Sequence, residues 1–364
     1  ATMGIASLFM PAVMGIIADR WIPAQRLLSL CHLFAAGFIT LAATRTDYNS
    51  LYTLVLLSVM FYMPTIALSN SVAYNALEKA GLDTVTHFPP IRVWGTVGFI
   101  CAMWVVDLGK MGLSATQLYF SATLGLILGL YSFTLPNCPI NRSGGGKSIV
   151  DLLGLRAFAL FKQRKMAIFF IFSMLLGMSL QITNAFADGY IKSFGDTGIH
   201  GAKYLGTFGV EHSTILISLS QISETLCILL IPFFLKRFGI KRVMLIAMFA
   251  WVLRFALLGA GNPGPGVWMF ILSMIVYGVA FDFFNISGSL FVEKETSAAI
   301  RSSAQGVFMI MTNGLGALIG SYLAGWVVNH YGWPLSWYLF AGFSLVVAIV
   351  FAVIFKYKHD PNRI

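Results

Sequence analysis

The 364-residue chain is 58% hydrophobic and 10% charged, and its formal net charge is +10. A soluble globular protein of this length would not tolerate that composition, so we predict an all-α, polytopic membrane protein. Nucleic acid does not explain the net charge, because the cations gather in short loops and follow membrane topology. Four cysteines without paired spacing and six histidines without ligand neighbours predict neither a disulfide framework nor a metal site.

Apolar runs predict eleven membrane spans, each long enough or nearly so for the ~30 Å of hydrocarbon that about 20 helical residues cross. The predicted spans are residues 1–18, 27–43, 51–71, 90–106, 115–135, 166–190, 213–234, 243–258, 267–290, 304–327 and 333–355. We therefore expect three parts: an N-terminal helical bundle at 1–135, a cytoplasmic linker at 136–165 with an amphipathic segment at 149–161, and a C-terminal six-helix bundle at 166–364.

The positive-inside rule orients these spans. Eighteen of the 24 Lys and Arg residues fall on one predicted side and four on the other, which predicts a cytoplasmic C-terminus. With eleven spans, residue 1 would then lie outside, within a helix already under way. The simplest expectation is a twelve-span protein of two six-helix bundles whose first transmembrane helix is absent from this chain.

The span at 267–290 contains an acid, Asp282, well inside its apolar run. Such a charge costs roughly 2.5–3.5 kcal/mol at the bilayer centre, so it normally faces a bundle interior or a water-filled path. At 100° per residue Tyr277 and Phe281 lie one turn apart beside the acid. The face of the acid holds Gly278, Asp282, Asn285 and Ser289. We expect Asp282 to line a polar cavity.

Three predicted spans of the second half share one pattern: two polar residues three positions apart within an apolar run. The pairs are Gln181 with Asn184, Gln221 with Glu224, and Asp282 with Asn285. Amides and carboxylates together supply donors and acceptors for a polar ligand. The alternative is that each pair joins helices through hydrogen bonds worth about 0.6 kcal/mol. Three pairs that include two acids favour a binding site.

Two segments resemble the loop signature of the major facilitator superfamily. The stronger is GIIADRWIPAQR at 15–26, and a weaker echo is FLKRFGIKR at 234–242, as expected for two related halves. The match narrows at FPPIRVWGTVGF (88–99) and QISE (221–224), which together with the opening stretch resemble the nucleoside:proton symporter family. This resemblance implies the major facilitator fold and proton-coupled nucleoside import across a bacterial inner membrane by alternating access.

The resemblance also implies binding roles for ten residues, with uridine, adenosine or xanthosine as the type of substrate. They are Arg92, Thr96, Phe99, Gln181, Asn184, Gln221, Glu224, Tyr277, Phe281 and Asp282. Amides suit ribose hydroxyls and a base edge, and two aromatic rings suit stacking on the base. Glu224 and Asp282 are the candidates for proton coupling, since burial in a span favours the neutral form of an acid. The alternative for either acid is a permanent ion pair with an arginine such as Arg92.

Other residues receive structural interpretations. Asp19 and Arg20 are expected to form a conformational latch on the cytoplasmic side, and Arg254 is expected to be an interfacial or structural cation. Glycines are expected to allow close helix contacts at positions 95, 98, 314, 316 and 320. Without the resemblance, Arg92 would be interpreted as a cation reaching for water at the edge of its span.

Competing functions remain at this point. A proton-coupled sugar or oligosaccharide permease is the nearest alternative, because Arg92, Gly95, Gly98 and Phe99 also resemble a sugar-contacting segment of oligosaccharide permeases. An intramembrane enzyme is disfavoured, since neither acid has a His or Cys neighbour at helical spacing. We expect a monomer in the lipid bilayer, driven by the proton gradient, with no cofactor and no nucleic acid partner.

Overall fold

The computed structural model describes residues 2–82, 84–112, 114–138, 155–196, 203–296 and 301–357, and all regular elements within them are helices. The chain divides into two compact units. One holds Ala1–Gly98 and Gly109–Leu155, and the other holds Phe99–Leu108 and Arg156–Ile364. A single helix, α4, is thus shared between the units. The domain limits expected from the sequence stay predictions, and residues 149–154 of the expected amphipathic segment lie outside the described residues.

The first unit contains the helices of the first third of the chain. They are α1 (Thr2–Arg20), α2 (Ala24–Ala43), α3 (Tyr48–Lys79), the start of α4 (Thr84–Leu108) and α5 (Thr116–Ser132). The Asp47 carboxylate caps α3 by accepting a hydrogen bond from the Ser50 amide at 2.9 Å, and hydrogen bonding to Ser50 lowers the pKa of this exposed acid. Helix α2 packs against both α3 and α5, and the Ser29 hydroxyl donates to the Gly129 carbonyl at 2.5 Å.

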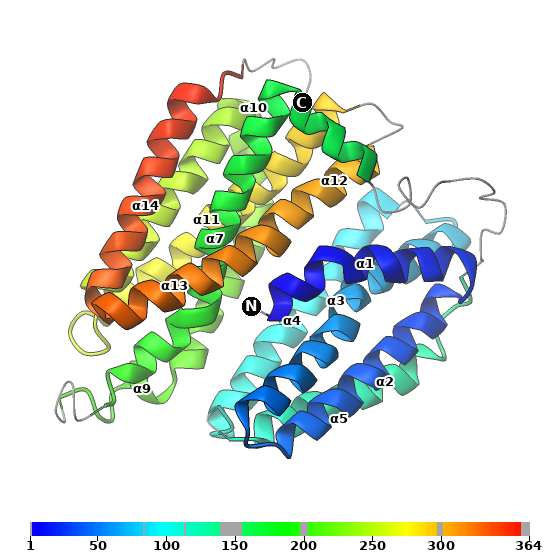
Figure 1. The fold of residues 1–364 in the computed structure, drawn as a ribbon, viewed down its shortest axis with the longest axis horizontal. Coiled ribbons are helices and arrows are strands. Elements are labelled where there is room, and N and C mark those ends of the chain that lie inside the picture. The colour runs from blue at the N-terminus through cyan, green and yellow to red at the C-terminus, as the bar shows by residue number, and fades with distance from the viewer. Residues whose placement is uncertain are drawn as a thin grey trace. The chain divides into compact units, whose positions relative to one another are not determined.

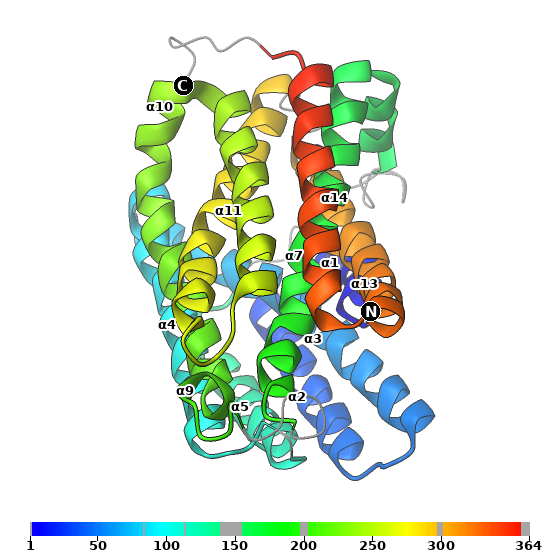
Figure 2. The same cartoon turned by 90° about the vertical axis from the view of Figure 1, so that its left-hand side faces the viewer.

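The second unit contains the helices of the rest of the chain (Figures 1 and 2). Its core is rich in buried aromatic residues. Helix α10 packs against α11 and α14, while α7 packs against η2, α13 and α14. The elements are η1 (Leu155–Lys162), α7 (Arg164–Ser193), α9 (Phe208–Glu211), α10 (Ser213–Ala260), α11 (Val267–Glu295), α12 (Arg301–Met309), η2 (Ile310–Gly316), α13 (Ala317–Tyr331) and α14 (Trp333–Ile354).

The predicted loop between spans 213–234 and 243–258 is reduced to a kink. Helical structure continues from Ser213 to Ala260 and breaks only at Gly239, where φ is +75° and ψ is 165°. Glycine adopts this backbone conformation without the steric penalty that a side chain imposes. The loop expected from the basic residues around 234–242 is therefore wrong as a loop, although the change of direction lies where the sequence predicted it.

The predicted span at 304–327 also differs from a plain α-helix, because residues Ile310–Gly316 form a π-helix. This segment presses on α7 at Gly177, where a Cβ atom would lie 2.2 Å from the Thr312 carbonyl oxygen. Gly316 and Gly320 make similarly close approaches to α7, as expected, whereas a Cβ at Gly98 would meet nothing within 4 Å. The prediction of a close helix contact at Gly98 is therefore wrong.

Seven helices of the described residues are long and apolar enough to cross a membrane, with α10 counted once. The segments Thr2–Gly15 and Val93–Leu108 are shorter apolar helices. The chain is therefore a multi-pass helical membrane protein. The eleven visible spans expected from the sequence stay a prediction.

Candidate functional site

Helix α11 carries the centre of the candidate site. The rings of Tyr277 and Phe281 stack with their centroids 5.8 Å apart and their planes at 20°, as the spacing predicted. Asp282, the next residue, is only 3% exposed, and among the described residues its Oδ2 atom has no hydrogen-bond partner. A buried carboxylate oxygen without a partner is unusual and marks this position as a functional candidate.

Two further helices bring predicted residues to Tyr277. Asn184 of α7 lies near Tyr277, and Glu224 of α10 lies close enough to interact electrostatically with both Tyr277 and Asp282. We call Asn184, Glu224, Tyr277, Phe281 and Asp282 the acidic cluster. It lies entirely within the second unit.

Close packing of α10 against α11 explains why Glu224 approaches Asp282. A Cβ atom at Gly278 would lie 2.6 Å from the Ser223 carbonyl oxygen, so only glycine allows this contact. The Ser223 hydroxyl donates a short hydrogen bond to the Ile275 carbonyl, which joins the two helices at the same level. Glu224 follows Ser223 directly and is therefore held beside α11.

Two predicted binding residues of the second half, Gln181 and Gln221, are close in sequence to the acidic cluster but are not part of it. Gln181 and Gln221 are half-buried, each one turn before a member of the acidic cluster. Their binding roles stay predictions.

The predicted residues of α4 and α1 are less defined. Thr96 is half-buried and Phe99 is 53% exposed, while the side chain of Arg92 lies outside the described residues. The side chains of Asp19 and Arg20, at the end of α1, also lie outside the described residues. The proposed contacts of all five residues, including the latch, stay predictions.

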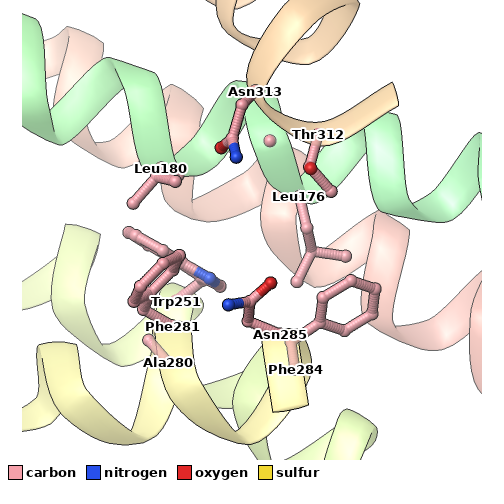
Figure 3. Close-up of a pocket in the computed structure, with 10 residues that line it drawn as sticks. Leu176, Leu180, Trp251, Ala280, Phe281, Phe284, Asn285, Thr312 and Asn313 are labelled. Atoms are coloured by element: carbon pink, nitrogen blue, oxygen red, sulfur yellow. The ribbon is translucent and has the colours of Figure 1, made fainter. Parts of the chain in front are cut away.

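A small, partly open pocket lies beside Phe281 of the acidic cluster (Figure 3). Figure 3 shows Asn285 of α11 and Asn313 of η2 on opposite walls, with Trp251 and Phe281 together on one side. The other lining residues are Leu176, Gly177, Leu180, Ala280, Phe284 and Thr312. Sequence reasoning missed Trp251, Thr312 and Asn313 as candidates. The adjacent polar residues Thr312 and Asn313, inside an apolar span, were the available signal for two of them.

Arg254 was expected to be an interfacial or structural cation, and its burial excludes the interfacial alternative. Its side chain is 2% exposed and packs against α11. Sequence position gives the depth of a residue in a span but does not show which way its side chain points, which is why the sequence left both alternatives open.

The end of α4 is attached to the start of α10 within the second unit. Buried Asp107 accepts a hydrogen bond from the Thr214 amide at 3.2 Å and contacts the His212 Nδ1 atom at 2.6 Å. One turn earlier, the Trp104 indole donates to the Ser218 hydroxyl at 2.8 Å. Because His212 makes no side-chain cap for α10, Asp107 supplies the cap from another helix. Within the described ranges, no three His, Cys, Asp or Glu side chains gather as a metal site.

Comparison with known proteins identifies the family. A family model described as "Nucleoside H+ symporter" matches residues 1–360. Nucleoside permease NupG of Escherichia coli K12 is 51% identical over 99% of this chain and 87% of its own. Xanthosine permease of the same organism is 50% identical, over 100% of this chain and 88% of its own.

Solved structures agree on the fold. The crystal structure of an aspartate-to-alanine variant of the nucleoside transporter NupG matches with a TM-score of 0.93 at 50% identity, over 98% of this chain and 89% of that one. A peptide transporter POT structure matches with a TM-score of 0.71 at 14% identity, over 96% and 83% of the two chains, and supports the fold alone. With its membrane helices, this chain has the major facilitator fold and belongs to the nucleoside H+ symporter family.

Proposed function

We propose that this protein imports nucleosides together with protons across the bacterial inner membrane, by alternating access. Membership of the nucleoside H+ symporter family supports the substrate class and the coupling ion. The observation that carries the site is the acidic cluster, in which two carboxylates, an amide and two stacked rings from three membrane helices lie together. The C-terminus faces the cytoplasm, and one copy of the chain is the transporting unit.

The nucleobase stacks on the ring pair of Tyr277 and Phe281, because flat apolar faces and a polar edge match such rings. The amide of Asn184 and the amides of Gln181 and Gln221 meet ribose hydroxyls and the base edge, since each offers both a donor and an acceptor. Arg92, Thr96 and Phe99 contribute to the same substrate from α4. Substrates are nucleosides of the uridine, adenosine or xanthosine type.

Glu224 and Asp282 exchange the coupled proton. The two carboxylates interact with each other, so a proton taken up from outside by one of them removes a like-charge repulsion. A protonated carboxyl group also gains a donor that a substrate hydroxyl or base acceptor can use. The loaded site then opens to the cytoplasm, where the nucleoside and the proton leave together.

Sealed proteoliposomes with an inward proton gradient test the function. Labelled uridine, adenosine and xanthosine should accumulate against their gradients, and an uncoupler should reduce each to simple equilibration. Equal accumulation with and without the uncoupler would exclude proton coupling.

The same vesicles distinguish nucleosides from sugars. A maltose permease of Geobacillus stearothermophilus is 23% identical over 92% of this chain and 79% of its own, which makes sugars the natural competitors to test. Excess unlabelled nucleoside should block labelled uridine uptake, whereas free maltose and ribose should not. Block by the sugars at equal concentration would favour a sugar permease.

A further inference from the structure

Arg254 is a fully buried cation that neither the family match nor the proposed site uses. It lies on the second half of α10, and its Nη1 atom donates to the Ser273 carbonyl at 2.5 Å. The Ser273 hydroxyl donates back to the Arg254 carbonyl at 3.1 Å. Its Nε atom has no hydrogen-bond partner, and no carboxylate lies within 4.0 Å of its guanidinium, among the described residues. A buried charge without an ion pair is costly and calls for another compensating group.

The ring of Tyr277 is that group. The Arg254 guanidinium carbon lies 4.7 Å from the ring centroid, within the range of a cation–π contact. Ser273 and Tyr277 are one turn apart on α11, so the guanidinium contacts two successive turns of that helix. Trp251, one turn before Arg254, meets the Tyr277 ring nearly at right angles, with centroids 6.1 Å apart. Arg254 and Trp251 therefore contact the same ring that stacks on Phe281.

Arg254 is one of several contacts between α10 and α11. The close approach at Gly278 and the hydrogen bond from Ser223 join the first half of α10 to α11. In the second half, the ring of Trp251 packs against Tyr277 without any charge. Replacing a buried charged group by an apolar one of similar volume is often neutral or stabilising, so packing alone would favour a residue such as methionine here. The charge is better explained by what it does to Tyr277.

We propose that Arg254 is a positioning residue for nucleoside binding, which holds the Tyr277 ring in the orientation that receives the base. It acts through its contact with the ring, without touching the substrate. This inference rests on the proposed function, because it requires that Tyr277 contacts the nucleoside.

Arg254→Met tests the role, since it removes the charge and keeps an unbranched apolar side chain. In proteoliposomes the KM for uridine should rise about 5- to 30-fold, the range expected for a desolvated cation–π contact, with little change in the maximal rate. The Tm in detergent should stay the same or rise. A lower Tm with an unchanged KM would show a fastening role and overturn the proposal.

A double-mutant cycle separates action through the ring from other effects. In a Tyr277→Leu background, Arg254→Met should raise the KM no further, because the ring is already gone. In a Tyr277→Phe background the ring remains, and the effect of Arg254→Met should persist. Equal effects of Arg254→Met in all backgrounds would overturn the proposal.

Conservative variants keep the test available if Arg254→Met does not fold. Arg254→Lys keeps a cation over the ring, and Arg254→Gln keeps a donor for the Ser273 carbonyl without the charge. The lysine variant should stay within about threefold of the parent KM, and the glutamine variant should show the full loss. Equal losses would contradict a role of the charge. Lys203→Met is the matched control, because Lys203 is exposed and lies 5.1 Å above the Tyr204 ring, and its KM should not change.

The results also separate this inference from the proposed site. If Tyr277→Leu leaves the KM for every nucleoside unchanged, Tyr277 is not in the site and both proposals fail. If Tyr277→Leu raises the KM while Arg254→Met does not, the site stands and only the role of Arg254 is rejected.

Discussion

Helices α11 and α4 both carry residues implied in nucleoside binding, but they hold those residues very differently. On α11, Tyr277 is 4% exposed and touches aromatic or polar side chains from two other helices. On α4, Phe99 is 53% exposed, and Trp94 is 73% exposed. The middle of α4 thus presents its aromatic side chains freely, whereas α11 holds them in place.

The difference shows how a transport site can be both ordered and adaptable. Rings fixed by neighbours lose little rotational freedom when a ligand binds, so the α11 residues are preorganised. Exposed side chains must be ordered at the moment of binding and contribute less per contact. We therefore assign most of the binding energy to α11 and its partners.

The largest effect is expected from replacing the two acids at the α10–α11 contact, Glu224 and Asp282. Loss of the coupling acid should abolish accumulation. In the parent protein, one charge moved through 100 mV supplies about 2.3 kcal/mol, which corresponds to a roughly 50-fold ratio of nucleoside inside to outside. Glu224→Gln and Asp282→Asn variants should be compared for accumulation and for nucleoside exchange in de-energised vesicles, where exchange should survive.

Asp188→Asn is the matched control, because Asp188 lies outside the acidic cluster and bonds Lys192 and Ser213. Its variant should accumulate nucleoside like the parent. If the Glu224→Gln and Asp282→Asn variants both accumulate nucleoside normally, neither acid carries the proton. The assignment of proton coupling to α11 and its partners would then be wrong.

A second test addresses the packing behind the pocket. Gly177→Ala would place a Cβ atom 2.2 Å from the Thr312 carbonyl oxygen, so it should cost about 1–3 kcal/mol of stability as an overpacked contact. Thermal unfolding in detergent measures the loss. Gly189→Ala on the same helix meets nothing within 4 Å and should be neutral or slightly stabilising. Equal stability of the two variants would mean that α7 and η2 do not pack this tightly.

A third test sharpens the description of α4, whose last turns are attached to α10. Asp107→Asn should lower stability by about 1 kcal/mol, because it removes the charge that caps α10. His212→Gln and the double variant should be measured alongside it by thermal unfolding. The single effects should not add, since both residues belong to one contact. Strict additivity would argue against the pair.

The smallest effect is expected at the exposed end of the comparison. Phe99→Leu should change the KM for uridine by only about twofold, as is typical of exposed positions. Tyr277→Leu should raise it at least about fivefold, from the energy of stacking a base on an aromatic ring. Uptake kinetics of the two variants provide the measurement. A loss at Phe99 as large as that at Tyr277 would remove the distinction between the helices.

Local periodicity predicted much of this molecule. The stacking of Tyr277 on Phe281 follows from helical spacing, which can be read within one span. Asp282, expected to line a polar cavity, faces the protein interior but is not among the residues that line the pocket of Figure 3. Proximity of Glu224 to Asp282 needed the family resemblance as well, because nothing in either span specifies its neighbour.

Contacts between distant parts of the chain were beyond sequence reasoning. Asp107 and His212 are 105 residues apart, and neither shows a local pattern that points to the other. Arg254 lies at a depth where a cation could turn outward or inward, and it turns inward because the Ser273 carbonyl and the Tyr277 ring, on a different helical segment, receive it. The π-helical segment Ile310–Gly316 packs closely against α7 at Gly177. The sequence shows that Thr312 and Asn313 are polar residues within an apolar span, but it does not show which way a π-helix turns their side chains.

The turn at Gly239 has a mechanical consequence. A single residue connects the two halves of α10, so their adjoining ends cannot separate. Any tilt of the half that carries Glu224 against the half that carries Trp251 and Arg254 has to pivot at this residue. The carboxylate proposed to exchange the proton and the two side chains that contact Tyr277 therefore lie on two helical segments that share one pivot, a single glycine.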